Sequence, residues 1–223
     1  AVCLNIALGM SLTTLEQPRA KVASRRAGIH ADAPAKINLT LEVFGRRDDG
    51  FHELRSLVIG VDLADQVRCR TLLEPGIVLD CNDPALNHGD NLAARAALAL
   101  ARRCGREPAL RIDLQKHIPV GGGLGGGSSD AATTLRLCDF LWETGLDATE
   151  FAAIGAELGS DVPLFFSLPS AVIEGRGERV SPVRLRWSGW VLLICPPTPV
   201  STAEVYRAFR PDDSAGFPSG TDR

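Results

Sequence analysis

A glycine-rich run that ends in two serines and an aspartate is the stretch of this sequence best suited to chemistry. The thirteen residues of Ile118–Asp130, IPVGGGLGGGSSD, include six glycines. Glycine has no Cβ, so such a loop can take positive φ angles and bring backbone N–H groups close to a ligand. The helix predicted after it begins with unpaired N–H donors and the positive end of its dipole. The run therefore predicts an anion site, and phosphate suits it best.

Two common classes of phosphate loop do not fit this run. A Walker A loop ends in Gly-Lys-Ser/Thr, whereas these glycines lead into Gly127–Ser129 without a lysine. A Rossmann fingerprint can be matched to three of the glycines, but it requires a strand that ends at the first of them. Here His117 and Pro119 intervene. A flexible surface loop is the remaining alternative, and the strand and helix patterns that flank the run closely argue against it.

Two charged residues outside the run are candidates for proton and phosphate chemistry. Asp161 precedes the apolar segment Val162–Phe166, so we expect partial desolvation to raise its pKa and suit it to accept a proton. Lys36 lies on the polar face of a predicted strand. An ammonium there would keep a nearby carboxylate ionised and could steady a phosphoryl group. On the residues alone, a surface or capping acid is the better interpretation of Asp161.

The elements that must position these residues are short strands and helices. In the first strand, Pro34–Phe44, apolar and polar residues alternate, which places Lys36 and Asn38 on one face. Strands that precede a mixture of helices and strands favour an α+β fold over a doubly wound sheet. Further strands are predicted at Phe51–Val61, Val67–Leu72, Ile77–Leu79, Leu110–Leu114, Ala171–Glu174, Val180–Leu185 and Trp190–Cys195, and helices at Asn91–Cys104, Ser128–Trp142, Thr149–Leu158 and Ser201–Phe209.

The overall composition argues against several classes of function. The net charge is −3 over 223 residues, so no basic surface suggests nucleic-acid binding. The six cysteines are scattered without a CxxC pair, which argues against a thiolate metal site and a disulfide framework. The apolar stretch Ala1–Leu15 is too short to span a bilayer. We expect residues 1–30 to be a disordered leader, with a transit peptide as the alternative, and residues 210–223 to be a disordered tail.

Several short motifs, in the right order, resemble the GHMP kinases, the family of galactokinase, homoserine kinase and mevalonate kinase. Pro119–Ala132 resembles the second motif of that family. Its GLGGGSS form is similar to the branch of 4-diphosphocytidyl-2-C-methyl-D-erythritol kinases. Pro34–Leu39, Asp49–His52 and Gly159–Pro163 are similar to the opening, DG(Y/F)H and G(A/S)DVP motifs of that branch. Asp90–Leu92 and the Val-Ser-Thr that ends at residue 202 match as well.

The resemblance covers residues 33–209 and implies a fold. Residues 31–180 would form the ATP-binding domain of a GHMP kinase, which is like domain 2 of ribosomal protein S5. Residues 181–209 would begin a ferredoxin-like second domain. We expect that domain to be truncated, because the third glycine-rich motif of the family does not follow Phe209. A truncated partner would weaken closure over ATP, so an inactive nucleotide-binding fragment stays open as an alternative function. Another GHMP kinase of the homoserine or mevalonate type is the other alternative.

The resemblance also implies an activity and its residues. The activity is ATP- and Mg²⁺-dependent phosphorylation of the 2-hydroxyl of a small molecule that carries cytidine diphosphate, in the non-mevalonate route to isoprenoids. The protein would be a cytoplasmic monomer or homodimer without nucleic-acid or membrane partners. Asp161 would be the base and Lys36 its partner. The implied ATP-binding residues are Pro119, Gly121, Gly122, Gly123, Leu124, Gly125, Gly126, Gly127, Ser128, Ser129, Asn91 and Leu92, with Ser128 also the candidate Mg²⁺ ligand; the implied substrate-binding residues are Asn38, Phe51, His52, Thr202 and Tyr206.

Some of these residues keep a simpler interpretation. Ser128 and Ser129 could act as N-caps of the helix that follows the loop. Phe51 departs from the tyrosine that is commoner in the family, and it keeps a ring but loses the hydroxyl. The resemblance implies that the cytosine stacks between Phe51 and Tyr206. Packing of the helix in which it lies is an equal alternative for Tyr206.

Overall fold

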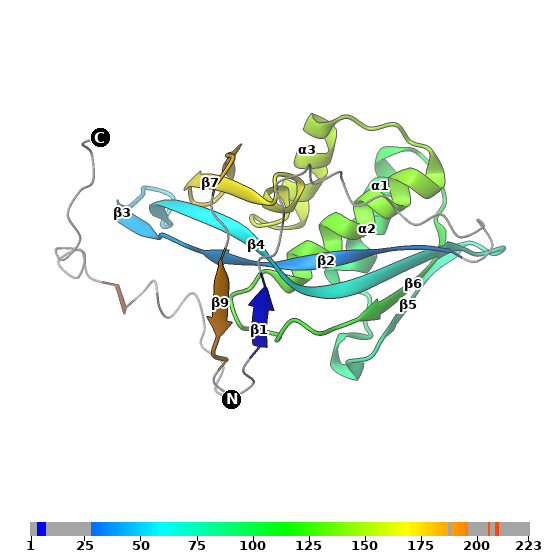
Figure 1. Ribbon diagram of the computed structural model, residues 1–223. Coiled ribbons are helices and arrows are strands. Elements are labelled where there is room, and N and C mark those ends of the chain that lie inside the picture. Colours follow the sequence, from blue (N-terminus) through cyan, green and yellow to red (C-terminus); the bar gives the residue numbers. More distant parts are fainter. Residues whose placement is uncertain (1–3, 8–27, 187–188, 196–204, 206–207, 210–223) are drawn as a thin grey trace.

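The computed structural model describes residues 4–7, 28–186, 189–195, 205 and 208–209. Over these residues the chain forms a seven-stranded sheet with helices packed on one face (Figure 1). Strands β1 (Leu4–Ala7) and β9 (Trp190–Leu193) form a separate antiparallel pair. The α+β fold expected from the sequence is confirmed.

The sheet is built around its longest strand. Its order is β5-β6-β4-β7-β8, and β2 and β3 pair with β4. The strands are β2 (Ile29–Asn38), β3 (Glu42–Arg46), β4 (His52–Thr71), β5 (Gly76–Cys81), β6 (Ala109–Gln115), β7 (Ser170–Gly175) and β8 (Arg179–Pro182). The helices are α1 (Leu92–Arg103), α2 (Gly126–Trp142) and α3 (Ala148–Leu158), with short 3-10 turns η1 (Pro84–Leu86) and η2 (Pro163–Phe166). The pair β5–β6 is parallel, and the other pairs of this sheet are antiparallel.

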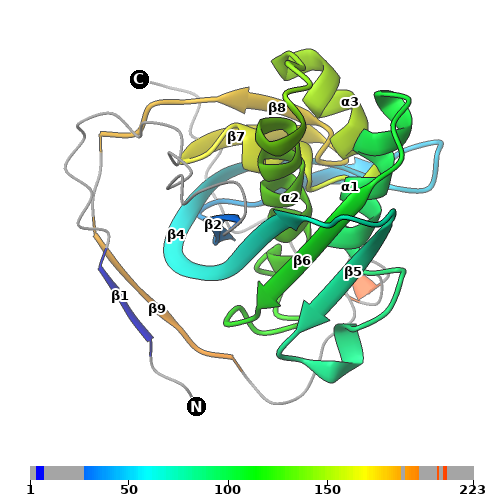
Figure 2. The same cartoon turned by 90° about the vertical axis from the view of Figure 1, so that its right-hand side faces the viewer.

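Strand β4 is a single strand of 20 residues, whereas the sequence predicted two strands at Phe51–Val61 and Val67–Leu72. The prediction was wrong because the period-two pattern continues through the gap. Leu63 and Asp65 face inward between the two predicted strands, and both are buried. The strand bends sharply as it crosses the molecule (Figure 2). It pairs with β3 and then β2 on one edge, and with β7 and then β6 on the other.

The predicted strand Pro34–Phe44 is instead two strands with a break at residues 39–41. Side chains replace part of the ladder at this break. The Leu57 N–H donates to Thr40 Oγ1 at 3.0 Å, and Ser56 Oγ donates to the Thr40 carbonyl. The register of β2 against β4 also shifts between Pro34 and Lys36, which marks a bulge.

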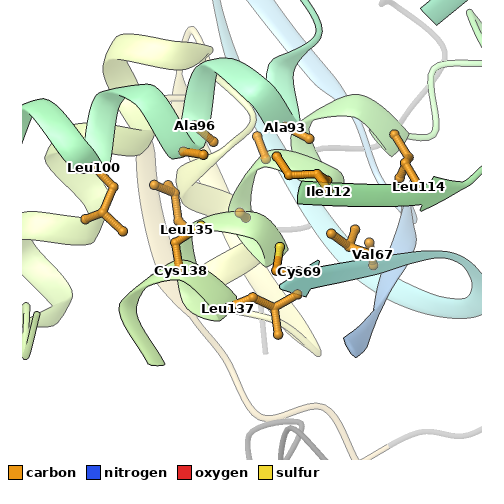
Figure 3. Close-up of a cluster of buried hydrophobic side chains, with 14 of the residues drawn as sticks. Val67, Cys69, Ala93, Ala96, Leu100, Ile112, Leu114, Leu135, Leu137 and Cys138 are labelled. Atoms are coloured by element: carbon orange, nitrogen blue, oxygen red, sulfur yellow. The ribbon is translucent and has the colours of Figure 1, made fainter. Parts of the chain in front are cut away.

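The main core lies between helices α1 and α2 and strands β4 and β6 (Figure 3). Helix α1 faces α2 largely with alanines, which allow the two helices to approach closely. On α2, Ala131, Leu135 and Cys138 lie at helical spacing and are fully buried; they form the buried stripe of this helix. This close packing holds the first turns of α1 and α2 side by side, and the glycine-rich run lies at that point.

Most predictions for the chain ends fall outside the described residues. Leu4–Ala7 form a strand and β2 begins at Ile29, which differs from the expected disordered leader at these residues. Thr202, Tyr206 and the tail from residue 210 lie outside the described part, and the ferredoxin-like second domain stays a prediction. Among the described residues, no helix has the length and apolar character needed to cross a membrane.

Candidate active site

The glycine-rich run forms a loop whose two ends are anchored in an apolar cluster. Ile118 and Leu124 are buried there with residues of β2 and β4. Between them the loop is exposed, and it turns through Gly121 and Gly123 at φ angles of 75° and 71°. These angles lie in the left-handed region, which favours glycine. The anchored ends fix the loop in place while its glycine backbone remains open to a ligand.

Helix α2 begins without a side-chain cap. Its N-cap is Gly125, at φ 73°, and no side chain accepts a hydrogen bond at this cap. The Ser129 N–H donates to the Gly125 carbonyl at 2.9 Å and starts the helical ladder. The interpretation of Ser128 and Ser129 as N-caps is therefore wrong, because both lie within the first turn. The N–H groups of Gly126, Gly127 and Ser128 precede the ladder, so they can bind an anion.

Gly125 is the point at which three distant parts of the chain meet. A Cβ at this position would lie 2.8 Å from Phe165 Cζ and 3.1 Å from Lys36 Cγ. The Lys36 N–H also donates to the Leu124 carbonyl at 2.9 Å. Strand β2 and turn η2 are therefore held directly against the loop, and only glycine fits between them.

The candidate catalytic residues reach the loop through these contacts. Lys36 Nζ donates to Asn38 Oδ1 at 3.4 Å, so the two lie side by side as predicted. Asp161 is half-buried in the turn between α3 and η2, four residues before Phe165. The structure thus brings Lys36, Asn38 and the turn that carries Asp161 to the same loop. The pairing of Lys36 with Asp161 stays a prediction.

The other predicted nucleotide-binding residues differ in how they face the loop. Leu92 lies against it, since its Cδ1 would be 3.5 Å from a Cβ at Gly127. Asn91 caps α1: its Oδ1 accepts from the Ala93 N–H at 2.9 Å and its Nδ2 donates to the Leu86 carbonyl at 3.1 Å. Ser128 is half-buried at the rim. Ser129 is fully buried, and its hydroxyl has no partner among the described residues.

A buried cluster of three charged residues lies directly beneath the start of α2. Lys116 Nζ donates to Asp65 Oδ2 and, at 2.7 Å, to Asp130 Oδ2. The side chains of Lys116, Asp65 and Asp130 are 8%, 0% and 3% exposed. Asp130 was expected at the helix start from the sequence, whereas Asp65 and Lys116 were not predicted. The sequence did contain a signal for both residues. Asp65 continues the alternation of buried apolar residues along β4, and Lys116 continues that of β6.

The environment of the cluster shifts two pKa values. Burial raises the pKa of Asp130 to about 7; the Lys116 ammonium opposes this shift and the Asp65 carboxylate adds to it. Burial acts to lower the pKa of Lys116, but the two carboxylates outweigh it and the net shift is upward. Lys116 is therefore charged near neutral pH, while Asp130 is poised between its two forms. The second oxygen of Asp130, Oδ1, has no partner among the described residues.

The predicted substrate-binding pair lies on the hairpin of β3 and β4. Phe51 is 53% exposed, and the Arg176 guanidinium lies 5.1 Å from the centroid of its ring. The His52 ring meets the Phe209 ring edge to face, with centroids 5.9 Å apart. A ring of the C-terminal segment thus lies near the hairpin, although the predicted one, Tyr206, is outside the described residues. Arg176, in the turn between β7 and β8, was not predicted.

Ion pairs at the surface hold this hairpin against β8. Glu53 accepts from Arg47 Nη1 at 2.5 Å and from Arg179 Nη2 at 2.9 Å. The hydrogen bond from Arg47, together with the charges of both arginines, holds the pKa of Glu53 below its usual value, although burial acts in the opposite direction. These side chains are each about one third exposed or more.

Comparisons with known proteins agree with this architecture. Residues 91–167 match the family model described as the GHMP kinases N terminal domain. The chain is 42% identical over 174 residues to a 4-diphosphocytidyl-2-C-methyl-D-erythritol kinase of Pseudomonas aeruginosa (strain LESB58), covering 78% of this chain and 61% of that protein. It is 46% identical over 179 residues to the protein of the same name from Symbiobacterium thermophilum, covering 78% and 62%. The chain thus spans less than two thirds of the length of these relatives.

A solved structure gives the same result. The crystal structure of a 4-(cytidine 5'-diphospho)-2C-methyl-D-erythritol kinase superimposes with a TM-score of 0.67 at 38% identity, over 82% of this chain and 65% of that one. The family match includes the glycine loop, α2 and the turn that carries Asp161. The chain therefore belongs to the GHMP kinase family, and its relatives lie in the 4-diphosphocytidyl-2-C-methyl-D-erythritol kinase branch.

Proposed function

We propose that the protein transfers the γ-phosphoryl group of ATP to the 2-hydroxyl of 4-diphosphocytidyl-2-C-methyl-D-erythritol. The observation that carries this proposal is the contact of Gly125 with both Lys36 and Phe165. It joins a phosphate-type loop to a strand with an ammonium group and to the turn that carries Asp161. The names of the relatives supply the acceptor. We also propose that the reaction takes place in the cytoplasm.

The residues of the loop fit the phosphates of a nucleotide. The N–H groups of Gly126, Gly127 and Ser128 open α2 without a capping side chain, and the exposed loop before them carries no side chain larger than valine at Val120–Gly123. Leu92 lies beside Gly127 and supplies an apolar surface for the base. This combination of N–H donors and an apolar wall suits ATP.

The described residues fit a Mg²⁺ ion only if the phosphates of the nucleotide supply most of its ligands. They contain no group of three or more His, Cys, Asp or Glu side chains that could hold a metal. Mg²⁺ in nucleotide sites needs few protein ligands, because phosphate oxygens and water complete its shell. Ser128, which is half-buried at the rim of the loop, is the ligand we propose. When bound, the ion would neutralise charge on the transferring phosphoryl group.

In the proposed mechanism, Asp161 orients the acceptor hydroxyl and takes its proton as the new O–P bond forms. The bond between the β- and γ-phosphates breaks, and ADP leaves with the electron pair. Lys36 places positive charge beside the transferring group, and Asn38 beside it is available to hold the acceptor. Little covalent chemistry is required of the protein, so positioning and charge account for most of the rate.

On the acceptor side, the Phe51 ring would stack on the cytosine and His52 would contact its polar edge. The exposed face of Phe51 and the ring of Phe209 beside His52 support a base-binding site at this hairpin. Thr202 and Tyr206 remain predicted contributors from outside the described residues.

Phosphorylation of this acceptor by Asp161→Asn tests the proposal. We expect kcat to fall by about 10²- to 10⁴-fold, because the variant loses the proton acceptor, while the affinity for ATP changes little. Asp62→Asn, at an exposed position of β4, is the matched control and should retain full activity. Equal activity of Asp161→Asn and the unsubstituted protein would remove this assignment.

The same assay separates the alternatives. Turnover of homoserine or mevalonate in place of the cytidine substrate would indicate another GHMP kinase. Binding of ATP without turnover of any of these acceptors would indicate a nucleotide-binding protein that lacks catalysis.

A further inference from the structure

The buried cluster of Asp65, Lys116 and Asp130 lies within contact distance of the first residue of α2. A Cβ at Gly126 would be 3.2 Å from Lys116 Nζ and 3.3 Å from Asp65 Oδ2. The peptide groups that we propose to bind phosphate therefore rest on the cluster. The side chains of the cluster are almost wholly buried, at 8% exposed or less, so the cluster supports the phosphate site from behind.

Each member of the cluster belongs to a different element. Asp65 is on β4, Lys116 follows β6, and Asp130 is in the first turns of α2. Asp65 Oδ1 accepts the backbone N–H groups of His117 at 2.6 Å and Ile118 at 2.8 Å. One carboxylate thus binds the segment that enters the loop, and the other belongs to the helix that leaves it. Lys116 joins the two.

Stability alone does not account for such a cluster. Removing three charges from water is expensive, and apolar residues of similar volume often give an equal or higher stability. The site lies beside well-packed apolar residues such as Ile118 and Leu124, so an apolar replacement was structurally available. Hydrogen bonds have strict directions, whereas apolar contacts do not. The cluster therefore fixes the position of β4 and the end of β6 relative to the start of α2.

We propose that Asp65, Lys116 and Asp130 are positioning residues that hold the entry and the exit of the glycine loop in the one relative orientation that aims its N–H groups at a phosphate. Two consequences follow. Loosening the cluster should increase the motion of the loop in the free protein. It should also reduce the free energy of nucleotide binding by more than it reduces the free energy of unfolding. The identity of the ligand as a nucleotide rests on the proposed function. The increased motion of the loop in the ligand-free protein does not depend on it.

The test uses the double variant Lys116→Met/Asp130→Asn. It removes one positive and one negative charge together, so the net charge of the cluster does not change when Asp130 is ionised. Asp65 loses its cation but keeps its two backbone donors, the N–H groups of His117 and Ile118. Lys116→Met alone would leave two buried carboxylates without a cation and could prevent folding. Hydrogen exchange of the amides of residues 120–130, measured without ligand, reports loop motion, and titration with Mg·ADP reports phosphate binding.

We expect the double variant to fold, to exchange its loop amides at least tenfold faster, and to bind Mg·ADP about 10- to 100-fold more weakly, as for a misplaced binding group. Asp130→Asn alone keeps an oxygen that can accept from Lys116, and it should retain both loop protection and affinity. Arg111→Met is the matched control on β6, since its guanidinium pairs with Asp80 and Asp113 instead.

The outcomes separate this inference from the proposed function. A folded double variant with unchanged loop exchange and unchanged affinity would overturn the inference, whatever the enzyme phosphorylates. Faster loop exchange with weaker Mg·ADP binding would support it even if the cytidine acceptor proved wrong. An equal effect of Arg111→Met on the loop would also overturn it, because the response would then be general to the sheet.

Discussion

The two ends of the candidate site are built in opposite ways. At the loop end, the charged residues Asp65, Lys116 and Asp130 are buried, and Gly125 leaves no room for a side chain. At the hairpin end, Phe51 is more than half exposed and its neighbours are held by surface ion pairs. The loop end is thus part of the core of the domain, whereas the hairpin end is part of its surface.

This difference indicates how each end can respond to substitution. A change at the loop end must disturb packing or uncover a buried charge, so it should weaken nucleotide binding and also lower stability to some degree. A change at the hairpin should affect the acceptor and leave the fold intact. The nucleotide side would therefore be common to many acceptors, and the hairpin would set which acceptor is bound.

The largest effect should come from Gly125→Ala. Its left-handed φ and the 2.8 Å contact with Phe165 predict a loss of about 2 to 5 kcal/mol in the free energy of unfolding. Gly121→Ala is the matched control, because it has nearly the same φ but no atom within 4 Å of its Cβ. Denaturant unfolding should show the smaller, purely conformational cost for Gly121→Ala. Equal losses would show that the packing at Gly125 is unimportant.

The pH dependence of stability should reveal the buried carboxyl of Asp130. Its folded pKa of about 7 lies above the ordinary 3.8, so the folded chain holds this proton more tightly than the unfolded chain. The resulting stability is complete at low pH and is lost as the pH rises through about 7. Lys116 and Asp65 are the titratable groups that act on it.

Asp130→Asn should therefore flatten the change in the free energy of unfolding between about pH 4 and 7, the range between the unfolded and folded pKa values of this carboxyl. Chemical denaturation at several pH values measures it. A slope that persists in Asp130→Asn would assign the titration to another group.

At the hairpin, Phe51→Ala should act on the acceptor alone. We expect KM for the cytidine substrate to rise about tenfold, as for the loss of one stacked ring, with KM for ATP and the melting temperature unchanged. Phe140→Ala, a partly exposed ring on α2, is the control for a general effect of losing a phenyl group. A parallel rise in KM for ATP would contradict the separation of the two ends.

The smallest effect should come from the ion pairs of the hairpin. Arg179→Gln removes one partner of Glu53, but Arg47 remains. Because exposed ion pairs contribute little, the melting temperature should fall by no more than about 2 °C. A fall as large as that for Gly125→Ala would show that the surface network is essential to the fold.

Local patterns were sufficient to predict much of this molecule. The glycine loop, the helix after it and the buried stripe of α2 follow from glycine content and from a period of 3.6 residues. The same patterns could not show that Lys36 and Phe165 meet at Gly125, because these residues lie 89 positions before and 40 positions after it. Such contacts depend on how β2 and η2 pack, which no local spacing encodes.

The buried cluster of Asp65, Lys116 and Asp130 was predictable only in part. Asp65 interrupts the apolar alternation of β4, and Lys116 interrupts the alternation just after the end of β6. Each was therefore visible in the sequence as a charged residue at an inward-facing position. Their contact with each other depends on the register that pairs Gln66 with Gln115, which the sequence did not predict. Arg176 left no signal at all, since an arginine in a surface turn is ordinary.

Strand β4 has a consequence for how the protein folds. Its first residue is His52, beside the acceptor hairpin, and Asp65 beneath the phosphate loop lies on the same strand. It pairs with β2, β3, β6 and β7, which come from both halves of the described chain. Such long-range pairing is slow to form, because the chain must close large loops first. The two ends of the site should therefore appear together, late in folding, as one cooperative unit.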